Sequence, residues 1–455
     1  MELKSVNPTT NRLIQTHEVM SVKAVDSILK AVDEGYASWS RQPSAVRTDL
    51  LRNLAVSLRE AKHDLAELAC DEMGKPLREG VSEVEKCAKV CDYYADNGKE
   101  FLAPKILEYD GARCSTVYQP IGTILAVMPW NFPFWQVFRF VAPNLVAGNT
   151  VVLKHAGNVS NCAKAIEAVI IRAGFPKDVF RSLIIPSERV AELIGDPRIK
   201  AVTLTGSTAA GKAVAGEAGK NIKKSVLELG GSDAYVVLED ADLDLAVDAC
   251  VTSRLINAGQ SCISAKRMVV VDAVHDEFVA RFVESMKSKV MGDPHHDDTD
   301  IGPMARLDLR EELHTQVTTS VANGACLALG GEIPLREGAF YPPTVLTNVA
   351  KGMPAYDEEL FGPVAAIIRA QDQAQAILIA NDSQFGLGAA IFTADVAKGH
   401  QIASTQLEAG NCFVNDFVKS DPRLPFGGTK LSGYGRELSK LGFYEFLNAK
   451  TVVVA

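Results

Sequence analysis

The spacing of apolar residues divides the chain into a helical N-terminal part and two longer parts in which strands and helices alternate. Residues 22–106 place apolar side chains three and four positions apart, which is typical of amphipathic helices. Between 120 and 240, short apolar runs alternate with such helical stretches. The expected strands are ILAVMP, TVVLKH, RSLIIP, AVTLTG and AYVVLE, and the expected helices are 134–147, 160–173, 187–195 and 208–220. This alternation predicts a parallel sheet covered by helices on both faces.

A second alternating series begins at residue 241 and predicts a second α/β domain. Its expected helices are 242–257, 275–290, 306–323, 373–381 and 396–406, and its expected strands are 267–272, 363–369, 388–393 and 411–415. A glycine-rich loop at 425–436 interrupts the pattern. The short apolar segment Lys450–Val454 predicts a last strand that needs a partner, in its own chain or in another subunit.

Length, charge and cysteine usage narrow the class of protein. A chain of 455 residues is too long for one hydrophobic core, and its net charge of −9 argues against a nucleic-acid partner. Neither a secretory leader nor an apolar run long enough to span a membrane is present. Nine scattered cysteines suit a reducing cytoplasm better than a disulfide framework. Cys87 and Cys91 are four apart with no second pair or nearby histidine, so we expect helix packing rather than zinc binding.

One strand of the first series runs into a turn suited to phosphate. After Thr205 the chain reads Gly206-Ser207 and then a helix, which leaves backbone N–H groups free at the helix N-terminus. The segment from Gly206 to Lys212 comes close to the phosphate-binding loop of nucleoside triphosphatases. However, Ala213 stands where that loop carries the hydroxyl that binds magnesium. Phosphoryl transfer is therefore poorly supported, and an ordinary βα turn stays open as the alternative.

Three residue types that could form a covalent catalytic site stand in short, unusual segments. Cys262 follows Gly-Gln-Ser, Glu228 precedes Leu-Gly-Gly, and Asn131 lies between Pro-Trp and Phe-Pro. A thiol beside a carboxylate base can form and hydrolyse a covalent intermediate, and an amide can donate to an oxyanion. Each residue alone also has an ordinary interpretation, as a buried small hydrophobe, a surface carboxylate or a turn-forming Asn.

Taken in order, these segments carry a resemblance to a known family. The motifs are PWNFP, LKHA, TGST, LELGG, GQSC, ELFGPV and PFGGTKLSGYGRE. Over essentially its whole length the chain resembles the aldehyde dehydrogenase superfamily. The resemblance implies an α/β fold of two Rossmann-like doubly wound domains plus a small β oligomerisation arm. It implies a dinucleotide-binding domain of residues 1–109 and 125–228, a catalytic domain of 229–435, and an arm of 110–124 and 436–455.

The resemblance also implies roles for individual residues. Cys262 would attack the aldehyde to form a thiohemiacetal, with the oxyanion held by the Asn131 amide and the Cys262 backbone N–H. Loss of hydride to the nicotinamide would give a thioester, which water activated by Glu228 would hydrolyse. No metal is implied. The implied cofactor residues are Lys154 at the adenosine ribose, Gly206 and Ser207 at the pyrophosphate, Glu359 at the other ribose, and Trp130 and Phe361 beside the nicotinamide.

One departure from the family bears on the choice of cofactor. Members that prefer NAD commonly carry a glutamate three residues after the lysine, and this chain has Gly157 there. Loss of that acid removes repulsion toward a 2′-phosphate, while Lys154 remains to pair with it. We therefore expect NADP as the cofactor, with NAD also accepted. The segment at Ile184–Ser187 lacks the glycine often found near the adenine, which leaves the adenine contacts open.

The substrate side of the resemblance is closest to bacterial succinate-semialdehyde dehydrogenases. Arg139, eight residues after Asn131, matches an arginine that would hold the distal carboxylate, and Ser420 matches a serine of the substrate loop. Lys419 could add charge, and Trp135 and Phe417 could wall the site. Ile256 stands where some of these enzymes carry a second arginine. The alternative for Arg139 is a structural ion pair.

Other functions stay open at this stage. Within the oxidoreductases, the alternative is a dehydrogenase for glutarate semialdehyde or another ω-carboxy aldehyde. From other classes, the alternatives are a catalytically silent family member and a thiol hydrolase that acts on esters. The resemblance implies a homodimer or homotetramer in the cytoplasm, with a small-molecule substrate and neither nucleic-acid nor membrane partners.

Overall fold

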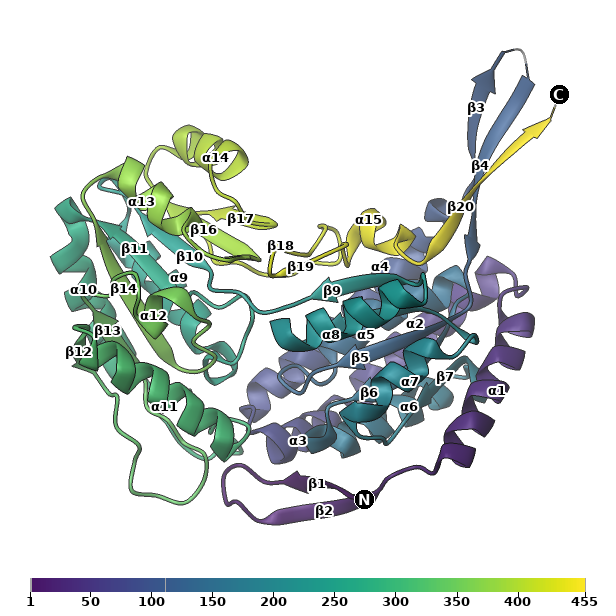
Figure 1. The fold of residues 1–455 in the computed structure, drawn as a ribbon, viewed down its shortest axis with the longest axis horizontal. Helices are drawn as coiled ribbons and strands as arrows, with labels where there is room; N and C mark the ends of the chain where they lie inside the picture. Colours follow the sequence, from purple (N-terminus) through teal and green to yellow (C-terminus); the bar gives the residue numbers. More distant parts are fainter. Residues whose placement is uncertain (1, 111, 455) are drawn as a thin grey trace.

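The chain forms two α/β lobes from which a three-stranded arm projects (Figure 1). The structure is a computed structural model that describes residues 2–110 and 112–454. We call the lobe that contains the N-terminal half the first lobe and the other the second lobe. Met1, Gly111 and Ala455, which the expected domain boundaries include, lie outside the described residues.

The N-terminal helices form as the apolar spacing predicts. They are α1 (Val22–Trp39), α2 (Ser44–Glu60), α3 (Lys62–Met73) and α4 (Leu77–Phe101). Ser21 caps α1, because its hydroxyl accepts a hydrogen bond from the Ala24 backbone N–H at 3.2 Å. Gly74 ends α3 with a φ of 78°, and a Cβ there would lie 2.7 Å from Pro303. Glycine is therefore needed at that turn.

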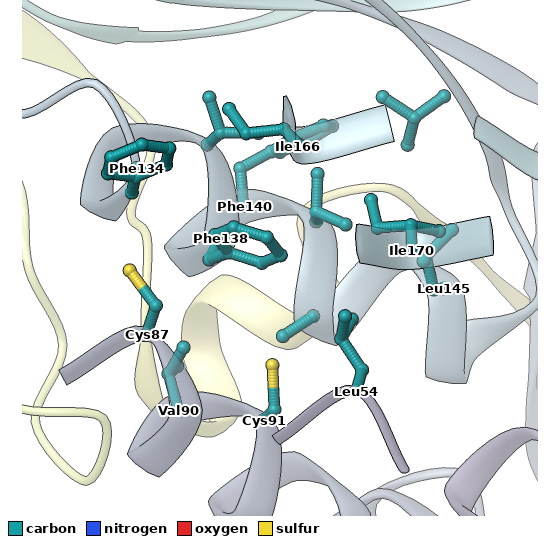
Figure 2. Packing of buried hydrophobic residues seen from close by; sticks show 14 of the residues in the cluster. Leu54, Cys87, Val90, Cys91, Phe134, Phe138, Phe140, Leu145, Ile166 and Ile170 are labelled. Carbon is teal, nitrogen blue, oxygen red and sulfur yellow. The ribbon is translucent and has the colours of Figure 1, made fainter. Parts of the chain in front are cut away.

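Cys87 and Cys91 pack in the core of the first lobe. Both cysteines lie on α4, and their fully buried side chains face α5 (Trp135–Ala147), as Figure 2 shows. Within residues 2–110 and 112–454, no group of three or more His, Cys, Asp or Glu could hold a metal ion. The expected packing role of the two cysteines is confirmed.

The sheet of the first lobe has the strand order β19-β9-β8-β5-β6-β7. Its parallel strands are β9 (Lys224–Glu228), β8 (Ile199–Thr205), β5 (Thr123–Met128), β6 (Thr150–His155) and β7 (Phe180–Ser182), and β19 (Gly433–Tyr434) is antiparallel to β9.

Helices cover both faces of this sheet. Along β5, Ile124 and Ala126 pack into one hydrophobic cluster, whereas Leu125 between them packs into another. The first cluster also contains residues of α2, α4, α5 and α6 (Ser160–Arg172). The second contains residues of α1, α7 (Val190–Gly195) and α8 (Thr208–Lys220). The doubly covered parallel sheet expected from the sequence is confirmed.

The second lobe carries its own sheet, with the order β12-β13-β14-β11-β10-β16-β17. Its strands are β12 (Cys326–Leu329), β13 (Thr344–Thr347), β14 (Val364–Ala370), β11 (Arg267–Val271), β10 (Ala234–Val237), β16 (Gly388–Phe392) and β17 (Asn411–Val414). Its helices include α9 (Leu243–Leu255), α10 (Asp272–Lys287), α11 (Leu307–Ala322), α13 (Gln373–Asn381) and α14 (Val396–Thr405). All neighbouring strands are parallel except β12 and β13.

Several elements differ from the expectations. The apolar run RSLIIP forms a strand only as far as Ser182, and the Ile184 carbonyl accepts from the Met20 N–H at 2.9 Å instead. The hairpin β1 (Glu2–Val6) and β2 (Leu13–Glu18) and the strands β9, β12 and β13 were not expected. These segments are short, and β2 and β12 are largely exposed, so their apolar pattern is weak.

The last strand finds its partner within the chain. β20 (Leu447–Val454) pairs antiparallel with β4 (Ala112–Pro120), which pairs with β3 (Lys105–Tyr109). This three-stranded arm is the part that projects from the body in Figure 1. The arm sheet begins at Lys105, earlier than the boundary expected at residue 110, and the domain boundaries stay predictions. Among the described residues, no helix is long and apolar enough to cross a membrane.

Candidate active site

The carboxyl edge of the first sheet collects residues that the sequence singled out. Because parallel strands end at the same edge, the loops that follow them lie together. Asn131 follows β5, Lys154 lies near the end of β6, Gly206 follows β8, and Glu228 ends β9. The order β9-β8-β5-β6 makes these four strands neighbours.

The second lobe contributes loops from the amino ends of its strands. Cys262 precedes β11, Glu359 and Phe361 precede β14, and Gly230 precedes β10. These three strands are adjacent in the sheet order β14-β11-β10. One edge from each lobe therefore faces the same space, and the candidate site is formed by two sheets rather than one.

A left-handed turn places the cysteine. Asn257, Ala258 and Gly259 have φ angles of 57°, 53° and 73°, directly before Gln260-Ser261-Cys262. Left-handed backbone costs a residue such as Ala258 about 1–2 kcal/mol, so other contacts must hold the turn. Asn257 Nδ2 donates to the carbonyl of Asn131 at 2.7 Å, which ties the cysteine loop to the loop after β5. On its other side, Arg254 is fully buried and donates to the Gly259 carbonyl.

Cys262 lies between two cavities. The first cavity has a volume of about 450 Å³, and its lining includes Trp130, Gly206, Glu228, Glu359 and Phe361. The second has a volume of about 300 Å³, and its lining includes Glu79, Lys86, Trp135, Arg139 and Ser420. Among the described residues, Cys262 alone lines both cavities. A small molecule in either cavity would therefore meet the same thiol.

The surroundings of Cys262 favour the neutral form of its thiol. Burial raises the pKa of Cys262 to about 12, while the nearby cations Lys266 and Arg139 act in the opposite direction. Lys266 is itself buried, and its Nζ donates to the carbonyls of Ser261 at 2.9 Å and Cys262 at 2.7 Å. It also pairs with Glu359 Oε1 at 3.1 Å. Sequence reasoning missed Lys266, although a lysine four residues after the thiol was visible.

The Asn131 amide is positioned to serve an oxyanion. The side chain is buried, and its Nδ2 donates to the carbonyl of Gln260 at 3.1 Å. An amide nitrogen carries two N–H groups, so one remains for another acceptor beside Cys262. Gln260 is held in turn, because its Oε1 accepts from the Ala305 backbone N–H at 2.8 Å.

Glu228 is an unpaired buried carboxyl. It is only 2% exposed, and neither of its oxygens has a hydrogen-bond partner among the described residues. Burial raises its pKa well above the usual value, and Glu437 raises it further, while Arg139 opposes both. A Cβ at Gly427 would lie 2.8 Å from Glu228 Oε1, and Gly427 has a φ of 156°. Glycine at that position therefore leaves room for the carboxylate.

Glu437 is the other functional residue that sequence reasoning missed. It is the final residue of the motif PFGGTKLSGYGRE, which the sequence identified only as a glycine-rich loop. Its buried carboxylate pairs with Arg139, whose Nη2 also donates to Thr205 Oγ1 at 3.1 Å. The ion pair weighed as the alternative for Arg139 is therefore present. Arg139 still lines the second cavity, so its expected contact with a substrate carboxylate stays a prediction.

The other residues expected on the substrate side separate into two groups. Ser420, Trp135 and Ile256 line the second cavity. Phe417 does not line it and packs against a hydrophobic cluster of the second lobe, and Lys419 pairs with Asp416 at 2.6 Å. The expectations for Phe417 and Lys419 are therefore not supported by the cavity.

The residues around the first cavity fit a dinucleotide. The rings of Trp130 and Phe361 lie 5.8 Å apart at 88°, and both line the cavity. Glu359 is held by the Gly231 N–H at 3.0 Å, and a Cβ at Gly230 would collide with it. Ser207 caps α8, so the helix N-terminus with its positive dipole end opens on the cavity.

The lysine expected at the adenosine ribose has a polar partner. Lys154 is buried, and its Nζ donates to Ser187 Oγ at 2.9 Å. Ser187 belongs to the segment whose missing glycine left the adenine contacts open. Gly157 begins a short helical turn of residues Gly157–Val159, and a Cβ there would lie 3.3 Å from Leu3. Lys154 and Ser187 are thus joined by a hydrogen bond, and Gly157 follows Lys154 by three residues.

Comparison with known proteins assigns the class of enzyme. The sequence profile described as the aldehyde dehydrogenase family matches residues 1–452. The chain belongs to the aldehyde dehydrogenase family, and its fold is that of the family.

Particular relatives cover the whole chain. A probable succinate-semialdehyde dehydrogenase (NADP+) of Synechocystis is 46% identical and covers 100% of both chains. A succinate semialdehyde dehydrogenase (NAD(P)+) of Escherichia coli is 45% identical and covers 98% of this chain and 97% of its own. The crystal structure of succinic semialdehyde dehydrogenase from Streptococcus pyogenes with NADP+ as the cofactor has a TM-score of 0.97, 38% identity and 99% coverage of both chains.

Proposed function

We propose that this aldehyde dehydrogenase oxidises succinate semialdehyde to succinate with NADP+ as the hydride acceptor. The observation that carries the proposal is the position of Cys262 between the two cavities. One cavity suits a dinucleotide, and the other has cationic side chains in its lining. The names of the relatives from Synechocystis, Escherichia coli and Streptococcus pyogenes support the same substrate and cofactor.

The first half of the reaction forms a bond to sulfur. Cys262 Sγ attacks the aldehyde carbon, and the carbonyl oxygen becomes an oxyanion held by Asn131 Nδ2 and the Cys262 backbone N–H. Because the pKa of the thiol is about 12, attack requires removal of its proton. Glu228 lines the same cavity as Cys262, so its carboxylate is the base that takes this proton.

The dinucleotide, when bound, supplies a nicotinamide ring that accepts the hydride of the former aldehyde carbon. Trp130 and Phe361 would hold that ring, Glu359 its ribose, and Gly206 and Ser207 the pyrophosphate. Lys154 and Ser187 would hold the adenosine ribose with its 2′-phosphate, and Gly157 adds no acid that would repel it. This last point favours NADP over NAD.

The second half of the reaction breaks the bond to sulfur. Loss of the hydride leaves an acyl group joined to Cys262 as a thioester. Glu228 releases the proton of Cys262 to solvent and, ionised again, takes a proton from water, and the resulting hydroxide attacks the acyl carbon. The same two N–H donors hold the oxyanion, and Cys262 leaves as a thiolate. Glu228 returns its proton to the thiolate and the new carboxylic acid loses its proton to solvent, so the products are succinate and the free enzyme thiol.

The arm supports an assembly of several copies. Its strands expose the apolar side chains of Ile106, Leu107, Tyr109, Val453 and Val454. Such a surface is typical of an interface between subunits. We therefore propose a homodimer or homotetramer, and the nine free cysteines favour a reducing cytoplasm as its compartment. Light scattering of the full chain, and of a chain with charged residues at Leu107 and Val453, would test the assembly. An unchanged mass for the variant would contradict it.

A substrate and cofactor panel tests the activity. Purified enzyme is mixed with succinate semialdehyde, glutarate semialdehyde or butanal, with NADP+ or NAD+, and the absorbance of the reduced cofactor is followed. The highest kcat/KM is expected for succinate semialdehyde with NADP+, and Cys262→Ala should be inactive. A higher kcat/KM for glutarate semialdehyde would favour the longer ω-carboxy aldehyde instead. Turnover of esters without any aldehyde oxidation would replace the proposal by a thiol hydrolase.

A further inference from the structure

The second cavity contains a cation that the mechanism above does not use. Lys86 lies on α4 and lines the cavity together with Cys262. Its Nζ donates to Ser420 Oγ at 2.8 Å and lies 4.2 Å from the centre of the Trp135 ring. Ser420 is one of the two residues that the sequence resemblance placed at the substrate carboxylate. The contact with Lys86 was not expected from the sequence.

The carboxylates nearest to Lys86 are held by other groups. Glu83 pairs with Lys75 and accepts from the backbone N–H groups of Phe134 and Trp135, each at 2.8 Å. Asp421 pairs with Arg423 at 2.8 Å. Among the residues that the structure describes, Lys86 forms no salt bridge.

Two acids line the second cavity: Glu83 is paired with Lys75, and Glu79 repels an anion only weakly. Glu79 also lines the second cavity and accepts from the Asn257 backbone N–H at 2.8 Å. Burial raises the pKa of Glu79 to about 7, so near neutral pH its carboxyl group is protonated in a large share of the molecules. Arg139, the remaining cation of the cavity, has its charge balanced by Glu437. Lys86 is therefore the cation of this cavity that has no anionic partner.

The surroundings of Lys86 favour an anionic ligand. Burial and, to a smaller extent, the positive charge of Arg139 lower the pKa of Lys86 to about 8. An ammonium group that has lost water and has only a hydroxyl and an aromatic ring as partners gains strongly from a carboxylate. The hydroxyl of Ser420, which lies beside it, can donate to the same carboxylate.

We propose that Lys86, together with Ser420, binds the distal carboxylate of the semialdehyde. The proposal rests on the proposed function, because it requires a substrate with a carboxylate. It places the carboxylate on α4 and on the loop after β17, with the aldehyde directed to Cys262. A substrate that carries a carboxylate fits this cavity because the Lys86 ammonium has no anionic partner there.

The test compares a charged and an uncharged aldehyde in variants of one residue. Lys86→Met keeps the length of the side chain but removes its charge, and should raise the KM for succinate semialdehyde roughly 10- to 100-fold. The KM for butanal should stay unchanged or fall. Lys86→Arg should restore most of the affinity, because it restores the charge. Lys89→Met, on the exposed face of the same helix, is the matched control and should behave as wild type.

The outcomes separate this proposal from the proposed function. If wild type does not prefer succinate semialdehyde to butanal, the proposed function fails. If wild type has that preference and Lys86→Met retains it, only the Lys86 proposal fails. Equal losses for both aldehydes in Lys86→Met and in Lys86→Gln would also overturn it, because the lysine would then serve the fold or the chemistry.

Discussion

Arg139 and Glu437 form a buried ion pair beside Glu228, the carboxyl that ends β9. One guanidinium therefore faces two carboxyl groups in a region that water hardly reaches. Two buried carboxylates with a single cation cannot both ionise easily, so a proton is retained between them. The ion pair thus influences the pH at which Glu228 becomes available as a base.

Removal of Glu437 should move the pH dependence of the enzyme. Glu228 acts only when ionised, so hydrolysis of the thioester rises as the pH passes through its pKa. Glu437 raises that pKa and Arg139 lowers it. Glu437→Gln should therefore move the rising limb of the kcat profile to lower pH. Arg139→Gln should move it to higher pH. Shifts of both variants in the same direction would contradict this account.

The sequence predicted most of the fold for a physical reason. Alternation of apolar runs and amphipathic stretches is strong for β5, β6, β8 and their helices, because these strands are buried on both faces. The hairpin of β1 and β2 has no such pattern, because its strands are partly exposed. Local sequence therefore predicts buried elements better than edge elements.

The candidate site was predictable only in part. Cys262, Glu228 and Asn131 stand in short distinctive motifs, and the structure places them around one space. Lys266 lies close to Cys262 in the sequence but was not singled out, whereas Lys86 and Glu437 became visible only through partners that lie far away in the sequence. Lys86 meets Ser420, and Glu437 meets Arg139, across several hundred residues. Pairing of charges depends on the fold, so a linear motif cannot show which arginine or lysine is free.

Introduction of an acid at Gly157 should reverse the cofactor preference. A carboxylate there would face the 2′-phosphate held by Lys154 and Ser187, and like charges brought together cost several kcal/mol. Gly157→Glu should therefore lower kcat/KM with NADP+ roughly 100-fold while NAD+ turnover stays close to wild type. The Cβ would lie 3.3 Å from Leu3, whose flexible side chain can move aside. Gly157→Ser adds the same Cβ without charge and is the control. Equal losses with both cofactors would reject the electrostatic explanation.

The Asn131 side chain should matter for the rate rather than for binding. Its second N–H is available to an oxyanion that exists only during the reaction, so Asn131→Ala should lower kcat roughly 100- to 1000-fold with little change in KM. The hydrogen bond from Asn257 Nδ2 is accepted by the backbone carbonyl of residue 131, so the substitution does not remove it. The measurement is steady-state kinetics with succinate semialdehyde. A rise in KM at constant kcat would assign Asn131 to substrate binding instead.

Lys266 should position the thiol and favour its ionised form. It donates to the carbonyls of Ser261 and Cys262, and its charge lowers a Cys262 pKa that burial raises to about 12. Lys266→Met removes that charge, so the pKa rises and the thiolate fraction at a given pH falls. Alkylation of Cys262 by iodoacetamide, which requires the thiolate, should become slower and its pH profile should move to higher pH. Circular dichroism of the variant checks that the fold is retained, and Lys212→Met, on the exposed surface of α8, is the matched control. An unchanged alkylation profile in a folded Lys266→Met enzyme would show that the lysine acts on Glu359 alone.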